Sequence, residues 1–283
     1  MPEPPELEVV TAAAKGAVAG AIGPFSETTA KLLDKLFGGA CEEMGGFLGD
    51  KAKDFRVERR QKRADRVLQK AKAVMDEASF EPQAVPDFIL YPLLNAASLQ
   101  DDETLQGKWA NLLTNASDPR QEKPIPVPFV SMLGELTVRE VKFLDALFEG
   151  INAPYGKRPL GIYPDKGGYT EEQLLAVYGD AGLLRYPELG RQPYLRNMTQ
   201  VAGERTADIE ADMADFNQTI GILRRSGILS VDSHPKPIRI AVGNPGAVLA
   251  NIPSKVDIET EEVVNVTTLG WSFVEKCREP KSD

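Results

Sequence analysis

The stretch from Val85 to Phe148 decides the fold of this 283-residue chain. It reads VPDFILYPLLNAASLQDDETLQGKWANLLTNASDP over Val85–Pro119 and, after a proline-rich bridge, PFVSMLGELTVREVKFLDALF over Pro128–Phe148. Five of its apolar residues recur at the spacing i, i+4, i+7, i+8 and i+11: Leu105, Trp109, Leu112, Leu113 and Ala116. This spacing predicts the buried face of an α-helix, with the tryptophan in the core rather than stacked on a ligand.

The flanks of this helix carry boundary signals. Ser98 and then the acidic run Asp101–Glu103 suit a helix N-terminus, which favours a side-chain cap and negative charge. Asp118 precedes Pro119, and the residue before a proline avoids helical backbone, so we expect the helix to end there. The acidic run also suggests a metal or acid–base site. Because adjacent residues do not share a helix face, we interpret it as the helix start instead.

A second helix is expected after an extended connector. The alternating prolines of Lys123–Pro128 cannot propagate a helix, and Thr137–Glu140 has the form of a capping box. The apolar face of this second helix comprises Val141, Leu144, Leu147 and Phe148. Gly150 is its expected C-cap.

The same stretch resembles the abortive infection alpha family, of the DUF4393 type. The residues that carry the resemblance are Leu93–Leu99, Asp101–Glu103, Leu105–Gln106, Trp109–Leu113, Asn115–Ala116 and Asp118–Pro119. The Leu136–Thr137 start of the next helix and Leu48–Lys51 upstream are similar too. The likeness is good from Leu32 to Phe148 and loose elsewhere. It implies a role in bacterial defence against phage, and it implies no catalytic residues.

Composition narrows the class of protein. The net charge of −9 disfavours a generic nucleic-acid binder. The only cysteines, Cys41 and Cys277, form neither a metal motif nor a disulfide framework. The first residues are acidic and proline-rich, unlike a signal peptide, and no apolar run reaches membrane-spanning length. We therefore expect a cytoplasmic protein.

The N-terminal segment, residues 1–25, is rich in small apolar residues. Ala12, Gly16 and Gly20 recur every fourth position, a pattern that lets helices approach closely and drives their association in membranes. Two interpretations stay open: a surface-packed N-terminal helix, and a segment that is sheltered until a trigger sends it to the membrane.

A basic helix is expected over Lys51–Lys72, which holds ten basic and three acidic residues. Its candidate contacts for phosphate or an anionic surface are Arg56, Arg59, Arg60, Arg63, Arg66 and Lys70. The alternatives are a solvated face and pairing with acidic groups of the same chain.

The last third resembles a winged-helix module. A capping box at Thr170–Gln173 starts a short helix, and Ile209, Met213, Phe216, Ile220 and Leu223 form a helical stripe that Gly227 ends. Strands are expected at Ile228–Val231, Ile238–Val242 and Val263–Thr267, with a turn at Ser233–Pro237 between the first two. A closing helix from Thr268 should bury Leu269, Phe273 and Cys277.

The helix that would enter DNA in such a module is acidic. Asp208, Glu210, Asp212 and Asp215 would be repelled by a duplex, so a structural or protein-binding role is the better interpretation. The sequence contains none of the common catalytic motifs: His234 is the single histidine and lies between prolines in an expected turn, and neither a phosphate loop nor a dinucleotide fingerprint occurs.

These observations predict a mainly α protein in three parts. They are the N-terminal segment 1–25, a helical domain over 26–150 that resembles the abortive infection alpha family, and a smaller winged-helix-like α+β domain over 169–279. The expected function is non-enzymatic anti-phage defence, without cofactor or metal, through a protein partner or a homo-oligomer and with action at the membrane. The alternative is a cytoplasmic nucleic-acid-binding regulator that uses the basic helix.

Overall fold

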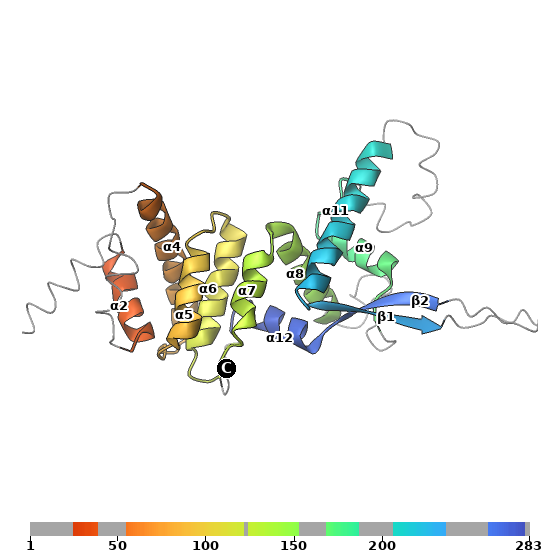
Figure 1. Cartoon of the computed structure of the whole chain (residues 1–283). Coiled ribbons are helices and arrows are strands. Elements are labelled where there is room, and N and C mark those ends of the chain that lie inside the picture. The colour runs from red at the N-terminus through yellow and green to blue at the C-terminus, as the bar shows by residue number, and fades with distance from the viewer. Residues whose placement is uncertain are drawn as a thin grey trace, which may run out of the picture. The chain divides into compact units, whose positions relative to one another are not determined.

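A computed structural model describes residues 25–38, 55–121, 124–152, 168–186, 206–235 and 260–280. Helices dominate these residues, and a two-stranded antiparallel sheet lies toward the C-terminal end, so the prediction of a mainly α chain with a small α+β part is confirmed (Figure 1). The chain forms two compact units. Unit 1 comprises residues up to Val138 together with those from Ser272 onward, and unit 2 comprises Arg139–Trp271.

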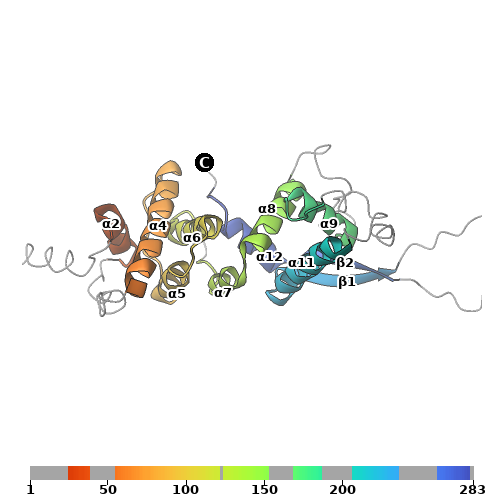
Figure 2. The same cartoon turned by 90° about the horizontal axis from the view of Figure 1, so that it is seen from above.

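Unit 1 is helical. Its helices are α2 (Glu27–Leu36), α4 (Phe55–Glu77), α5 (Asp87–Ala97), α6 (Glu103–Ser117) and α7 (Pro128–Glu135), joined by the end of α12 (Thr268–Lys276). Helices α4, α5 and α6 lie side by side in both views (Figures 1 and 2). The predicted stripe of α6 lies in the core, where Trp109, Leu112 and Leu113 are fully buried.

The start of α6 differs from the prediction. Asp102, not Ser98, is the N-cap: its carboxylate accepts hydrogen bonds from the main-chain N–H groups of Thr104 (2.8 Å) and Leu105 (3.1 Å). Ser98 instead caps the C-terminus of α5. The predicted end is confirmed, because α6 stops at Ser117 with Asp118 as its C-cap.

The proline-rich connector ends earlier than predicted. Pro128 occupies the first turn of α7, a helix that the sequence prediction had not separated from the connector. Proline suits that position because its missing N–H would have no partner in the first turn of a helix. The burial of Phe129, Met132 and Leu133 anchors α7 in the core.

Unit 2 combines helices and the sheet. Its elements are α8 (Val138–Asn152), α9 (Glu171–Asp180), α11 (Thr206–Arg225), β1 (Leu229–Pro235), β2 (Thr260–Val266) and the first turn of α12. The capping box of α9 is confirmed: Thr170 Oγ1 accepts from Gln173 N–H, and Gln173 Oε1 accepts from Thr170 N–H. On the stripe of α11, Phe216 and Leu223 are fully buried.

The sheet pairs β1 with β2 in antiparallel register, from Leu229 opposite Val266 to Pro235 opposite Thr260. Tyr169 adds a single bridge on the other side of β2, through two 2.7 Å hydrogen bonds with Val264. The strand predicted at residues 263–267 is therefore confirmed, and that at 228–231 marks the start of β1. The turn predicted at residues 233–237 is wrong up to Pro235, and Ile238–Val242 lies outside the described residues.

Three further predictions concern the ends of α8 and α11 and the buried face of α12. Gly150 does not cap α8, which runs on to Asn152. Leu269 is 40% exposed rather than buried, whereas Phe273 and Cys277 are buried as expected. Gly227, at φ +76°, ends α11 as predicted, because positive φ is accessible to glycine at little cost.

Candidate functional site

The basic helix predicted at residues 51–72 is α4, and its cations divide into two groups. The first group binds the rest of unit 1. Arg60 donates from Nε to Ser98 Oγ (3.1 Å) and from Nη2 to Asn95 Oδ1 (2.6 Å). Arg63 forms an ion pair with Asp101, and Lys70 Nζ donates to the main-chain oxygen of Glu103 at 3.2 Å. These three cations bind α4 to the segment that joins α5 to α6.

The second group faces outward. Arg59, Lys62 and Arg66 are exposed, and their spacing of i, i+3 and i+7 places them on one flank of the helix. Lys62 pairs with Glu58 at 2.6 Å, and this hydrogen bond lowers the pKa of the Glu58 carboxyl. We call Arg59, Lys62 and Arg66 the outer flank of α4. Arg56 belongs to the same helix, but its side chain lies outside the described residues.

The outer flank of α4 has the chemistry to contact a surface of repeated negative charge. Guanidinium groups bind phosphate oxygens through paired hydrogen bonds, and the two arginines lie seven residues apart, which is about 10 Å along a helix. The other cations that the sequence suggested, Arg60, Arg63 and Lys70, are half-buried and bind α5 or the start of α6. Fewer residues therefore form the exposed cationic surface of α4 than the sequence suggested.

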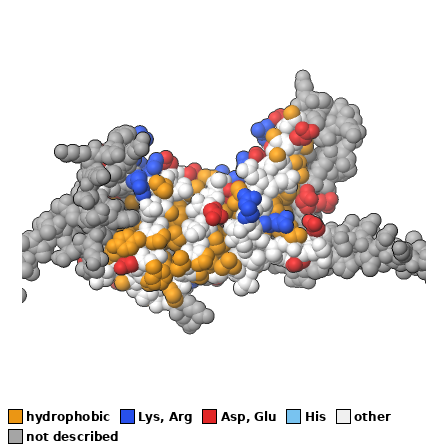
Figure 3. All heavy atoms as spheres, in the orientation of Figure 1, with side chains coloured by type: hydrophobic (Ala, Val, Ile, Leu, Met, Phe, Trp, Pro, Cys, Tyr) orange, Lys and Arg blue, Asp and Glu red, His pale blue; other side chains and the backbone are white. Residues whose placement is uncertain are grey.

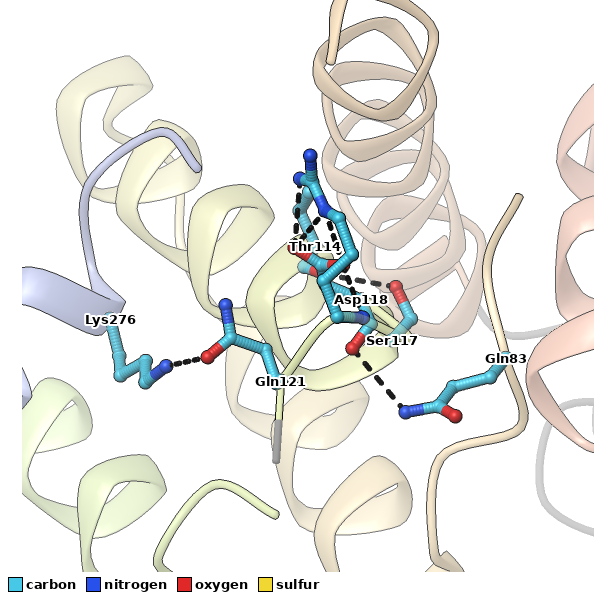
Figure 4. Close-up of polar contacts among 7 residues, drawn as sticks. Gln83, Thr114, Ser117, Asp118, Gln121 and Lys276 are labelled. Atoms are coloured by element: carbon cyan, nitrogen blue, oxygen red, sulfur yellow. Dashed lines mark hydrogen bonds and ion pairs between the residues drawn. The ribbon is translucent and has the colours of Figure 1, made fainter. Parts of the chain in front are cut away.

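The turn after α6 is a second polar cluster in unit 1 (Figure 4). The side chain of Asp118 is buried, and both its oxygens accept hydrogen bonds from the Arg120 guanidinium at 2.9–3.2 Å. Burial raises the pKa of the Asp118 carboxyl, but the hydrogen bonds and charge of Arg120 outweigh it, so the pKa lies below its ordinary value of 3.8. The guanidinium also lies 5.0 Å from the centre of the Phe80 ring.

Two other segments of unit 1 form hydrogen bonds with the same turn. Gln83 N–H donates to the main-chain oxygen of Ser117 (2.8 Å), and Gln83 Nε2 donates to that of Asp118 (3.4 Å). Lys276 of α12 donates to Gln121 Oε1. Because Gln83 and Lys276 reach this turn from other parts of unit 1, the cluster joins segments of the fold (Figure 4).

Two asparagines of α6 hold the end of α12. Asn111 Nδ2 donates to the main-chain oxygen of Cys277 (3.2 Å), and Asn115 Nδ2 donates to those of Lys276 (3.0 Å) and Arg278 (2.8 Å). The last carbonyls of a helix lack partners within the helix, so these amides satisfy them. Sequence reasoning missed this role. The available signal was two asparagines one turn apart inside a strong helix, where asparagine is a poor helix former.

Three of the four acids on α11 have partners within unit 2. Arg185 pairs with Asp208, and its main-chain N–H donates to buried Asp212 at 2.9 Å. Arg139 pairs with Asp215 at 2.8 Å. Asp208, Asp212 and Asp215 of the acidic run that disfavoured DNA binding thus have partners from the loop after α9 and from the start of α8.

Some sequence predictions fall on parts that the structure does not describe. Ala12, Gly16 and Gly20 lie there, and so does the side chain of His234. Within the described ranges, no helix has both the length and the apolar character to cross a membrane. The same ranges contain no group of three His, Cys, Asp or Glu side chains placed to bind a metal ion.

A sequence model of the family "Abortive infection alpha" matches residues 58–277. The match covers most of the chain, includes elements of both units, and spans the α6 stripe and the turn at Asp118 on which the resemblance was based. The chain therefore belongs to the abortive infection alpha family, whose name suggests a defence role. No curated protein and no solved structure matches this chain.

Proposed function

We propose that this chain is a non-enzymatic anti-phage defence protein of the abortive-infection type. It senses infection through contacts with a protein partner and then harms the infected cell at the membrane. The observation that carries the defence role is the family match over residues 58–277. Contact with an anionic surface is supported by the outer flank of α4, whose arginines face outward.

A non-enzymatic role is supported by the hydrogen-bond partners of the buried carboxylates. The buried carboxylates of the described residues are Asp118, Glu140 and Asp212. Asp118 is bound by Arg120, Glu140 accepts from Thr219 Oγ1 at 3.3 Å, and Asp212 accepts from the main chain of Arg185. Catalytic acids and bases must reach a substrate, whereas these groups reach donors of their own fold.

The membrane step combines two features. The small-residue spacing of Ala12, Gly16 and Gly20 favours close helix association in lipid, and the outer flank of α4 would bind anionic headgroups at the surface. The two features make separate predictions, because one acts through insertion and the other through charge.

Phage plating tests the defence role. Bacteria expressing the full chain should lower plating efficiency across a broad phage panel, and a chain lacking Met1–Phe25 should lose the effect. A charge-reversed variant, Arg59→Glu with Arg66→Glu, should lose protection while Arg224→Glu with Arg225→Glu keeps it. The control changes the net charge equally at two exposed arginines of α11. Absence of protection by the full chain would argue against defence.

Dye release tests the membrane step separately. The purified full chain should release dye from vesicles that contain anionic lipid, more weakly from neutral vesicles, and less after truncation of Met1–Phe25. Protection against phage without binding or leakage of either vesicle would remove the membrane step and leave the defence role standing.

A nucleic-acid-binding regulator is the second candidate, and the outward arginines of α4 favour it as well. It predicts binding of duplex DNA or RNA that weakens steeply with salt and is lost in the Arg59→Glu, Arg66→Glu variant. No binding at low salt would exclude it. Binding to anionic vesicles but not to nucleic acid would favour the membrane as the surface that the outer flank of α4 contacts.

A further inference from the structure

The cationic surface of α4 includes an acid. Hydrophobic side chains gather over α5 and α7 on the face drawn in Figure 3, whereas lysine and arginine side chains lie toward α4. On α4, the Glu58 carboxylate accepts a hydrogen bond from Lys62 Nζ at 2.6 Å. The two residues are four positions apart and therefore share a face of the helix. A negative charge thus lies beside the middle cation of the outer flank of α4.

Glu58 is ionised at neutral pH, so protonation does not release Lys62. The hydrogen bond from Lys62 and the positive charge of Lys62 lower the pKa of the Glu58 carboxyl below its ordinary value of 4.5. An anionic surface that binds Lys62 therefore has to displace Glu58 from it. Glu58 also repels such a surface through its own charge.

The pair of Glu58 and Lys62 is exposed enough to be opened. Their side chains are 52% and 60% exposed, and ion pairs in contact with water are weak because solvent screens them. A single anion offers Lys62 no more than Glu58 already does. A surface with many negative charges also meets Arg59 and Arg66, which lie three residues before and four residues after Lys62. Such a surface gains enough from the neighbouring contacts to displace Glu58.

We propose that Glu58 determines the specificity of the outer flank of α4, by holding Lys62 until a membrane dense in anionic lipid displaces it. The inference rests on the proposed membrane step and names the kind of membrane that this step requires. Binding then depends steeply on the fraction of anionic lipid, because the full set of cations is engaged only above the fraction that opens the pair. The outer flank thereby discriminates between membranes of high and of low negative charge.

Binding of the full chain to vesicles with increasing fractions of anionic lipid tests this inference. Glu58→Gln keeps the length of the side chain and removes its charge. This change should strengthen binding at a given anionic fraction by about fivefold, which is the usual effect of one charge near an anionic membrane. Half-maximal binding should move to a lower fraction of anionic lipid.

Glu77→Gln is the matched control for the loss of one negative charge. Glu77 is exposed at the other end of α4, about 28 Å along the helix from Glu58. That separation exceeds the screening length of about 8 Å at physiological ionic strength, so Glu77→Gln should change vesicle binding by less than about twofold. Equal effects of the two substitutions would show that only the net charge matters, and the proposal would be wrong.

Removal of Lys62 in two backgrounds tests whether Glu58 acts through it. Lys62→Gln should weaken vesicle binding by about fivefold in the Glu58→Gln chain and by about half that factor where Glu58 remains. The loss is smaller in the second case because opening the pair offsets part of what the contact contributes. Identical losses in both backgrounds would contradict an action of Glu58 through Lys62.

The outcomes separate this inference from the proposed function. Vesicle binding that is lost in the Arg59→Glu, Arg66→Glu variant but unchanged by Glu58→Gln would remove the role of Glu58 and leave the membrane step standing. No vesicle binding by any of these chains would exclude both. If Glu58→Gln strengthens binding of duplex DNA and not of anionic vesicles, the partner of the outer flank is a nucleic acid and the proposal is wrong.

Discussion

Asn115 of α6 and Lys276 of α12 are joined by a 3.0 Å hydrogen bond from a side-chain amide to a main-chain oxygen, across 161 positions of sequence. The amide of Asn115 is buried, and it donates also to the carbonyl of Arg278 at 2.8 Å. A buried carbonyl oxygen that loses its hydrogen-bond donor still carries the free-energy cost of its removal from water. The end of α12 in unit 1 therefore depends on Asn115 together with Asn111, which donates to the carbonyl of Cys277.

Asn115→Ala should lower the free energy of unfolding by about 1–3 kcal/mol, because carbonyls at the end of α12 would lose their donor. Urea denaturation followed by circular dichroism measures the change. Asn217→Ala is the matched control, since Asn217 is exposed on α11 and alanine is the better helix former, so its effect should stay within about 0.5 kcal/mol. Equal losses of unfolding free energy in both variants would contradict the proposed role of Asn115 in holding the end of α12.

Asp118→Asn should destabilise the fold at neutral pH and much less in acid. Arg120 makes the pKa of the Asp118 carboxyl lower in the folded than in the unfolded chain, so folding favours the ionised form. This contribution is complete above the ordinary pKa of 3.8 and is lost as the pH falls through the lower folded value.

The measurement for Asp118 is urea denaturation of both proteins at neutral and acidic pH. The difference in unfolding free energy should be about 1–3 kcal/mol at neutral pH and should shrink below the ordinary pKa of 3.8. A difference that is constant with pH would show that the charge of Asp118 does not stabilise the fold.

Gly270→Ala should destabilise unit 2 by about 1–3 kcal/mol, because a methyl group there would overlap the main-chain oxygen of Ile228, which cannot turn aside. Gly107→Ala provides the contrast. Nothing lies within 4 Å of a methyl group at Gly107, inside α6, so this change should stabilise by roughly 0.5–1 kcal/mol through helix propensity. Thermal unfolding of the two variants should therefore shift in opposite directions.

Arg60→Ala and Arg66→Ala should separate the two groups of cations on α4. Arg60 loses two side-chain hydrogen bonds to α5 and its end, so its loss should cost about 1 kcal/mol of stability. Arg66 is exposed, and its removal should change stability by less than about 0.5 kcal/mol. Equal effects on chemical denaturation would show that the division within α4 is wrong.

Several signals within one or two helical turns were read correctly from the sequence. The capping box of Thr170 and Gln173 places both partners three residues apart, and the proline at 119 acts on its own neighbour. The stripe of α6 is likewise a local pattern. Such features need no knowledge of the tertiary fold.

Other errors arose where contacts with a distant part of the chain determine the structure. Ser98 was expected to cap α6, yet its hydroxyl donates to Asn95 and accepts from Arg60, while Asp102 stands closer to the helix. Leu269 follows the apolar spacing of α12 but is exposed, because the spacing does not say which side a neighbour covers. The partners of Arg63 and Asn115 lie in distant parts of the sequence. The sequence alone therefore could not show which cations of α4 bind unit 1, or that Asn115 holds the end of α12.

The assignment of Ser272 and later residues to unit 1 has a consequence for biosynthesis. Phe129 packs edge-on against Phe273, with ring centres 5.5 Å apart, so the core of unit 1 includes a residue translated after all of unit 2. A nascent chain still held at the ribosome before Phe273 emerges would carry an open core at α7 and unbound amides on α6. Folding of this unit is therefore expected to finish only after α12 has left the exit tunnel, and a premature stop codon ahead of Ser272 should yield a chain that proteases or chaperones recognise.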